Sequence, residues 1–366
     1  MTSAGMRERL TGWLSKVSTH DPSALHWARG VLLLDVMLVP LVFFWAYGHE
    51  VYVVSALIGA VFSLVTDPGR AYGQRVIRMI LFGLFGAGVT ALGFWLGGKA
   101  WGWLVLVTFA VTLVCGLAIV AGAHALVAGM MLNIWFIITL GIGFGLHQQS
   151  HITSHVWAQV LAWAAGSTLW ILVTFIVWLV SGRPDAPQPV AELPGDTTPK
   201  KLNGPIVAFA LIRALALAGA VAIAFGANLT HGVWLPIATV IAMKPSVEQS
   251  TVVATQRVIG ALIGAVAAGL LLLIPANEHG VRLLAIDHGL QVVALVLLVH
   301  AAAVMFFNYA LFMAAITAAV LVLEDLFQPS NYSAEGYRVL WTLCGVAIGV
   351  AVMLLPQLLA RRKAHA

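Results

Sequence analysis

Long apolar runs, separated by short polar stretches, occupy most of the chain. A run of about 20 apolar residues is long enough to cross a lipid bilayer as an α-helix. Of the twelve candidate runs, 51–66 is short for a span, and 232–243 is too short unless it is broken or re-entrant. The pattern predicts an all-α polytopic membrane protein with about twelve transmembrane helices, at 30–47, 51–66, 76–97, 102–121, 124–145, 157–180, 206–226, 232–243, 257–275, 290–305, 308–324 and 337–356.

A proline-rich stretch separates the sixth run from the seventh. Residues 181–205 contain six of the fourteen prolines, at positions 184, 187, 189, 194, 199 and 205. Such a stretch cannot continue a regular helix, so we expect a linker here. The chain is thereby predicted to have five parts: a cytoplasmic N-terminal segment 1–29, a first six-helix membrane repeat 30–180, a cytoplasmic linker 181–205, a second six-helix membrane repeat 206–356 and a basic cytoplasmic tail 357–366.

The sequences on the two sides of this linker share an order of features. Gln74-Arg75-Val76-Ile77 recurs 182 positions later as Gln256-Arg257-Val258-Ile259. Each copy opens a glycine-rich helix and follows a short apolar segment that ends in a charged residue and a proline, Asp67-Pro68 or Lys244-Pro245. This order predicts two parallel six-helix repeats with a short or broken second helix in each repeat. Because each repeat has an even number of spans, we expect them to be related by an axis along the membrane normal.

Charge is scarce and lies mainly on one predicted side of the membrane. Only 9% of the residues are charged, against about 25% in a soluble domain, and the mean hydropathy is +0.97. With the N-terminus in the cytoplasm, 16 of the 19 Lys and Arg residues fall on the cytoplasmic side and 3 on the other. The positive-inside rule therefore predicts that both termini are cytoplasmic. Since this placement accounts for the net charge of +5, we expect no nucleic-acid partner.

No sequence pattern typical of an enzyme or a cofactor site occurs. The chain lacks a G-x-x-x-x-G-K-[ST] phosphate loop, an H-E-x-x-H zinc motif and a G-x-S-x-G nucleophile motif. His147, His151 and His155 have the spacing of one helix face, but Asp, Glu and Cys are absent around them. We interpret this segment as an outer interfacial loop. The sequence predicts no enzymatic activity, no cofactor and no metal.

The clearest motif lies in the second half. Trp234-Leu235-Pro236 precedes Lys244-Pro245 and then Gln256-Arg257-Val258-Ile259-Gly260 with Gly264. This order resembles the membrane module of the fusaric acid resistance and aromatic acid exporter family, whose halves carry a W-x-P turn, a terminal proline and an R-x-x-G-x-x-x-G helix. The resemblance is specific over 232–273 and weaker in the first half, where Arg78 replaces the first glycine. It implies a bacterial inner-membrane protein that exports aromatic or other organic acids.

Broken helices at corresponding positions of two repeats point to a transport site. The predicted break residues, Pro68, Pro236 and Pro245, free backbone groups that must line a cavity or be buried in protein. An arginine at the start of the next helix attracts anions, although each arginine taken alone also fits an ordinary positive-inside anchor. The predicted substrate-binding residues, with the amides inside the spans, are Arg75, Arg257, Lys244, Trp234, Asn133 and Asn308.

Ionisable groups inside apolar runs are energetically unfavourable and usually have a role. Asp35, His124 and His300 are the proton-coupling candidates. Asp35 follows Arg29 by six residues, about 9 Å of helix, and we expect it to be partly desolvated. The alternative is that Asp35 pairs with a nearby arginine at the cytoplasmic interface.

The sequence predicts a secondary exporter of aromatic or other amphipathic organic acids, driven by proton antiport. Its partners are a small organic anion and the lipid bilayer, with a homo-oligomer or an accessory subunit left open. A passive anion channel on the same fold and a non-transporting membrane scaffold are the alternatives, and the two short segments argue against a major facilitator. We interpret the G-x-x-x-G pairs as internal packing: Gly93/Gly97, Gly141/Gly145, Gly260/Gly264 and Gly345/Gly349.

Overall fold

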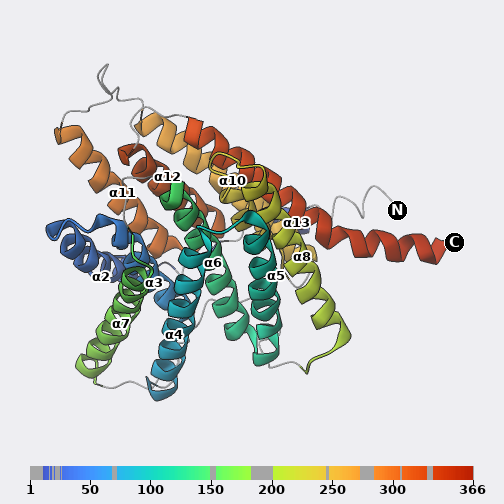
Figure 1. Ribbon diagram of the computed structural model, residues 1–366, viewed down its shortest axis with the longest axis horizontal. Helices are drawn as coiled ribbons and strands as arrows, with labels where there is room; N and C mark the ends of the chain where they lie inside the picture. Colours follow the sequence, from blue (N-terminus) through green and yellow to red (C-terminus); the bar gives the residue numbers. More distant parts are fainter. Residues whose placement is uncertain are drawn as a thin grey trace. The chain divides into compact units, whose positions relative to one another are not determined.

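The computed structural model describes residues 27–67, 72–148, 154–182, 201–244, 247–272, 284–305, 307–327 and 333–365, with a few positions between 11 and 25. Within this part of the chain every regular element is helical (Figure 1). Each of the twelve predicted runs overlaps one α-helix, with bounds that differ by up to about ten residues, and the all-helical class is confirmed. The helices are α2 (Trp27–Ala46), α3 (Val53–Thr66), α4 (Tyr72–Leu96), α5 (Trp101–Leu117), α6 (Ala123–Gln148), α7 (Val156–Val180), α8 (Gly204–Gly226), α9 (Trp234–Ala242), α10 (Val247–Leu271), α11 (Leu284–Val304), α12 (Tyr309–Phe327) and α13 (Ser333–His365), with the 3-10 turns η2 (Glu50–Tyr52) and η3 (Ala118–Ala121).

Seven of the described helices are long and apolar enough to cross a bilayer. They are α4, α5 with η3, α6, α7, α8, α10 and α13. The apolar parts of α2, α3, α11 and α12 are shorter, and α9 has only nine residues. The chain is therefore a multi-pass membrane protein, whereas a total of twelve spans stays a prediction.

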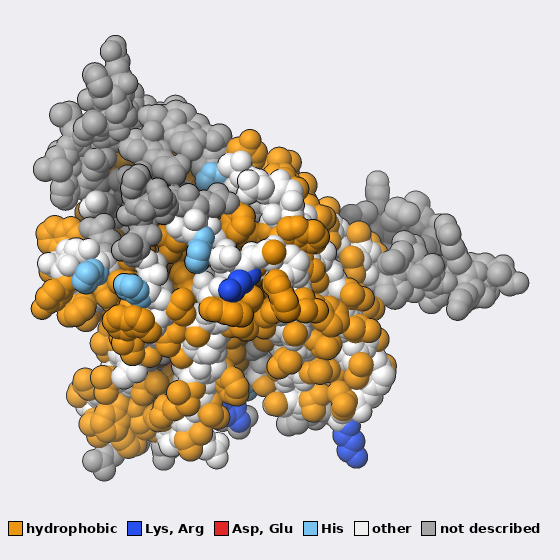
Figure 2. Space-filling model, viewed as in Figure 1, with side chains coloured by type: hydrophobic (Ala, Val, Ile, Leu, Met, Phe, Trp, Pro, Cys, Tyr) orange, Lys and Arg blue, Asp and Glu red, His pale blue; other side chains and the backbone are white. Residues whose placement is uncertain are grey.

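Large apolar side chains are exposed along the helices. Trp45 is 70% exposed, Val114 69% and Val180 83%. Hydrophobic side chains also predominate on the face shown in Figure 2, where Lys and Arg are few. Extensive apolar surface is a liability in water, but in lipid it is the surface that the solvent favours.

The chain divides into two compact units. Unit 1 comprises residues 1–34 and 230–366, and unit 2 comprises residues 35–229. In unit 2, α8 packs on α5. In unit 1, the first residues of α2 pack on α11, where the Val299 carbonyl oxygen lies beside Gly30. Unit 1 thus contains the first residues of α2, which opens the first predicted repeat, and unit 2 contains all of α8, which opens the second. The predicted domain boundaries stay a prediction.

The predicted linker gives only its last residues to the described part of the chain. Residues 183–200 lie outside the described residues. Asn203 caps α8, because its side-chain oxygen accepts the Ile206 N–H at 3.1 Å. Pro205 lies in the first turn of α8, where a missing N–H costs no intrahelical hydrogen bond. The helix thus begins slightly before the predicted end of the linker.

The helices of the two units pack in a corresponding order. In unit 2, α3 packs on α7, α4 on α6 and α7, and α5 on α6. In unit 1, α9 packs on α13, α10 on α12 and α13, and α11 on α12. The second set repeats the first when α3 to α7 are matched with α9 to α13.

Glycines bring these helices into backbone contact. A Cβ atom at Gly345 of α13 would meet the Leu235 carbonyl oxygen of α9, and one at Gly166 of α7 would meet the Ala56 carbonyl oxygen of α3. Only glycine allows so close an approach. Three of the four G-x-x-x-G pairs contact a neighbouring helix of their own unit in this way, as expected for internal packing: Gly93/Gly97, Gly260/Gly264 and Gly345/Gly349.

The variant Gly264→Val tests this packing. The Ala314 carbonyl oxygen of α12 lies only 2.5 Å from the position of the new Cβ atom. We expect α10 and α12 to be forced apart, with a loss of about 1–3 kcal/mol or more and a lower Tm in detergent. Gly269→Val on the same helix is the control, because nothing lies within 4 Å of its Cβ position. An equal loss of Tm in both variants would show that valine weakens the helix itself and that packing is not responsible.

Candidate functional site

The first Gln-Arg copy lies where α3 ends and α4 begins. Asp67 follows the last residue of α3 with an extended backbone (φ −60°, ψ 115°), as expected before a proline. Arg75, in the first turn of α4, donates from Nε to Asp67 Oδ1 at 2.6 Å and from Nη2 to Oδ2. The two side chains are only 15% and 10% exposed. This bidentate ion pair neutralises the guanidinium, so Arg75 does not present the free positive charge that we expected.

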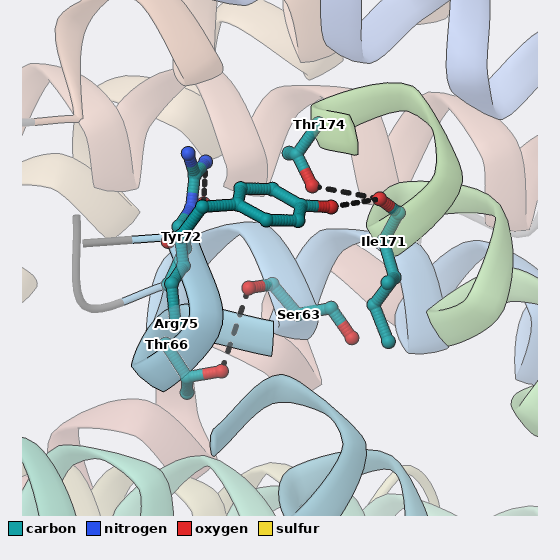
Figure 3. Close-up of polar contacts among 7 residues, drawn as sticks. Ser63, Thr66, Tyr72, Arg75, Ile171 and Thr174 are labelled. Carbon is teal, nitrogen blue, oxygen red and sulfur yellow. Dashed lines mark hydrogen bonds and ion pairs between the residues drawn. The ribbon is translucent and has the colours of Figure 1, made fainter. Parts of the chain in front are cut away.

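The polar groups around Arg75 join α4 to α7. The Tyr72 hydroxyl donates to the Ile171 carbonyl at 3.4 Å, and the Thr174 hydroxyl donates to the same carbonyl at 2.9 Å (Figure 3). Tyr72 and Arg75 come from the first turn of α4, so the turn is held from two sides, by α7 and by Asp67. These contacts fix the first turn of α4 in place, so their role is structural.

The second Gln-Arg copy has different surroundings. The charged residue before the proline is Lys244 here, 13 positions before Arg257, whereas in the first half it is Asp67, 8 positions before Arg75. Arg257 of α10 is only 3% exposed, donates from Nη1 to Met313 Sδ at 3.7 Å and interacts with the Tyr309 hydroxyl. Its Nε has no hydrogen-bond partner, and it forms no ion pair with a carboxylate in the described part of the chain.

Arg257 lies beside the first turn of α12. Asn308 caps that helix, because its Oδ1 accepts the Leu311 N–H at 3.1 Å, so this predicted substrate-binding residue has a structural role. A helix N-terminus carries partial positive charge, which makes an uncompensated guanidinium beside it unfavourable. An anion placed there would be stabilised by both groups. The geometry around Arg257 therefore favours an anionic ligand.

The short helix α9 ends just before α10, the helix that carries Arg257. Met243 and Lys244 follow α9 without helical structure, and Lys244 is half-buried. Ser250 of α10 fixes the turn: its Oγ accepts the Lys244 N–H at 2.9 Å and donates to the Lys244 carbonyl at 3.3 Å. The backbone N–H and carbonyl of Lys244 are thus satisfied inside the protein, as a membrane environment requires.

One predicted break residue has a different role. Pro236 is the third residue of α9, within the first turn, where the backbone N–H has no intrahelical partner. Proline is compatible with a helix at this position, so Pro236 marks the start of α9 and does not break it. Pro68 and Pro245 lie outside the described residues.

Aromatic and cationic side chains gather at the other end of α9. The Arg338 guanidinium of α13 lies 3.7 Å from the centre of the Trp234 ring. Tyr337 stacks between His231 and Trp341, with ring centroids 6.1 Å and 6.3 Å apart. Such cation–π and stacking contacts also suit the ring of a ligand. Sequence reasoning missed Arg338, because no sequence spacing connects it to Trp234.

The remaining predicted residues lie apart from Arg257. Asn133 is fully buried on α6 in unit 2. Asp35 is exposed on the surface of α2, and its expected desolvation and its alternative pairing with a nearby arginine both stay predictions. His124 is half-buried in the first turn of α6. His300 of α11 is half-buried and packs on Trp27, with ring centroids 5.6 Å apart.

The histidine run lies around the end of α6 and the start of α7. His147 is in the last turn of α6 and His155 precedes α7, whereas His151 lies outside the described residues. His147 Nδ1 lies 2.7 Å from the Gly143 carbonyl oxygen. Among the residues that the structure describes, no group of three His, Cys, Asp or Glu side chains is arranged to hold a metal ion.

Comparison with known protein families gives a match for the second half of the chain. Residues 205–352 match the family described as Fusaric acid resistance protein-like. Over these residues the chain is similar to that family. The match spans Trp234, Lys244 and Arg257 and confirms the resemblance predicted from their motif. No curated protein and no solved structure matches the chain.

This family suggests a membrane transporter or efflux protein. The matched segment contains Arg257, α9 and the start of α12, and it ends within α13. The residues that favour an anionic ligand therefore lie inside the part of the chain that the family covers.

The variants Asp67→Asn and Arg75→Gln test the structural role of the first copy. Each leaves one partly buried partner without its counter-charge, so we expect each to lose about 3 kcal/mol of stability and to lower Tm in detergent. The double variant removes both charges, and we expect its loss to be smaller than the sum of the single losses. Strict additivity would show that the two side chains do not depend on each other.

Proposed function

We propose that this chain transports organic anions and that Arg257 binds their negatively charged group. The observation that carries the proposal is the buried guanidinium of Arg257, which has no carboxylate partner in the described part of the chain. A buried cation without a counter-charge is unfavourable by several kcal/mol, and an anionic ligand removes that cost. The family match supports the proposal, because it suggests a membrane transporter or efflux protein.

The proposed substrates are aromatic or other amphipathic organic acids. α9 is about 13 Å long at 1.5 Å per residue. Lys244 follows its last turn and precedes the helix of Arg257, while Trp234 and Arg338 lie at its first turn. An aromatic acid carries a ring that stacks on aromatic side chains and a carboxylate that pairs with a guanidinium. The chemistry at both ends of α9 therefore fits one class of molecule.

We further propose export driven by proton antiport. In the orientation that the charge distribution predicts, Lys244 and Arg257 are reached from the cytoplasm, and Trp234 lies toward the outer side. His300 is the preferred coupling residue among the three candidates, because it lies in the same unit as Arg257 and is half-buried. Histidine is also the side chain suited to exchange protons near neutral pH. Asp35 and His124 stay as the other candidates.

We propose in addition that the two halves are copies of one six-helix unit. The corresponding packing order of α3 to α7 and of α9 to α13 supports this, as do the matching glycine contacts of α7 on α3 and of α13 on α9. In this scheme Arg75 and Arg257 occupy equivalent positions with different surroundings. Arg75 is neutralised by Asp67, whereas Arg257 is available to a ligand.

The variant Arg257→Gln tests the proposed substrate site. In a strain lacking the gene, we expect sensitivity to salicylate, benzoate or 4-hydroxybenzoate that the wild-type gene relieves. Glutamine cannot supply the charge-assisted hydrogen bonds, so we expect the variant to lose about tenfold in protective effect or more. Inhibitory acid concentrations measure this, with membrane levels checked by immunoblot.

Arg78→Gln is the matched control for this experiment. Arg78 is an exposed arginine of α4, and its replacement removes a positive charge without changing a buried site. We expect Arg78→Gln to protect as the wild type does. Full protection by Arg257→Gln at wild-type membrane levels, or a deletion strain that no acid sensitises, would argue against the proposed function.

A further inference from the structure

A second arginine is buried deep inside unit 2. Arg213 is 1% exposed and is the tenth residue of α8, about 14 Å from Gly204 and about 20 Å from Gly226 at 1.5 Å per residue. Its Nε and Nη2 have no hydrogen-bond partner, and it forms no ion pair in the described part of the chain. A charged group near the middle of an apolar helix is strongly unfavourable unless a partner compensates it.

The packing register places polar groups of α5 at the level of Arg213. α5 and α8 are antiparallel, because the end of α8 packs on the start of α5. Near the other end, Gly116 of α5 packs on Ala210 of α8. Arg213 follows Ala210 by three residues, so it lies level with the α5 segment between Thr112 and Cys115.

Asn133 of α6 reaches the same level. Gly129 packs against the Cys115 carbonyl oxygen, and Asn133 lies one turn further along α6, beside Thr112. The Thr112 hydroxyl donates to Asn133 Oδ1 at 3.3 Å, whereas Asn133 Nδ2 has no partner. Both side chains are 0% exposed. Nε and Nη2 of Arg213 and Nδ2 of Asn133 are thus three buried nitrogen atoms at one level whose N–H groups have no acceptor in the described part of the chain.

We propose that Arg213 and Asn133 form an anion-binding site inside unit 2, with Thr112 as a positioning residue. The ligand is a monovalent anion that accepts N–H hydrogen bonds, either a free halide or the carboxylate of an organic acid. It compensates the guanidinium charge and accepts hydrogen bonds from Nε and Nη2 of Arg213 and from Nδ2 of Asn133. The Thr112 hydroxyl holds Oδ1 of Asn133 and so orients its amide. The existence of this site does not depend on the role in transport that is proposed for Arg257.

Thermal unfolding of the full chain in detergent tests the proposal. The buffer contains gluconate, which is replaced stepwise by bromide, chloride or benzoate at constant ionic strength. We expect the Tm of the Arg257→Gln variant, which lacks the proposed transport site, to rise with the bound anion, because a ligand that binds only the folded state stabilises it. A rise with bromide and chloride identifies a halide site, and a rise with benzoate alone identifies a carboxylate site.

Arg213→Met removes the buried charge and keeps an apolar side chain of similar length. We expect this variant to lose the anion-dependent rise and to be at least as stable as the wild type in gluconate, because no uncompensated charge is left. A purely structural role of Arg213 predicts the opposite result in gluconate. Arg213→Met is compared with its parent in the Arg257→Gln background, so that an acid bound at the proposed transport site contributes no rise.

A second variant keeps the test informative if Arg213→Met does not fold. Asn133→Leu retains the guanidinium and removes the amide donor, so we expect the apparent dissociation constant of the anion to rise about tenfold. Two results would overturn the proposal. One is a Tm of Arg257→Gln that none of the three anions raises, and the other is a rise in that background that persists with Arg213→Met or is undiminished with Asn133→Leu.

Discussion

Close helix packing at glycine is the constraint on which both units depend. Gly345 of α13 admits the backbone of α9, and Gly260 and Gly264 of α10 admit α12. Between membrane helices the hydrophobic effect gives little attraction, so association relies on the van der Waals contact that small residues allow. This packing holds the short α9 against longer helices and encloses the side chains of α10 that face α12. The position of Arg257 follows from it.

In apolar surroundings a buried charge is strongly unfavourable unless an opposite charge compensates it. Arg75 meets Asp67 across the turn between α3 and α4, and this pair is a structural element. Arg257 and Arg213 are more deeply buried, and neither has a carboxylate partner in the described part of the chain. Since burial of an uncompensated cation is unfavourable, both sites favour an anion. The scarcity of charge in this membrane protein thus leaves these two buried arginines without a carboxylate partner in the described part of the chain.

The helices could be predicted from the sequence because run length and apolarity are sufficient signals in a membrane. The contacts of the buried polar residues could not, since they depend on packing between distant segments: Tyr309 lies 52 positions after Arg257, and Asn133 lies 21 positions after Thr112. Proline is also ambiguous in sequence, because Pro236 begins a helix where a break was expected. The position of Asp35 along α2 could be predicted from the sequence, but whether its side chain lies on an exposed or a buried face could not.

The flux of an aromatic anion through the purified chain tests the central claim most directly. Proteoliposomes loaded with labelled 4-hydroxybenzoate are held at zero membrane potential with potassium and valinomycin, with and without a proton gradient directed inward. We predict that the gradient accelerates loss of label through the wild type well above protein-free liposomes, and that Arg257→Gln abolishes this acceleration. Equal rates for the wild type and Arg257→Gln, or for the wild type and protein-free liposomes, would contradict the account.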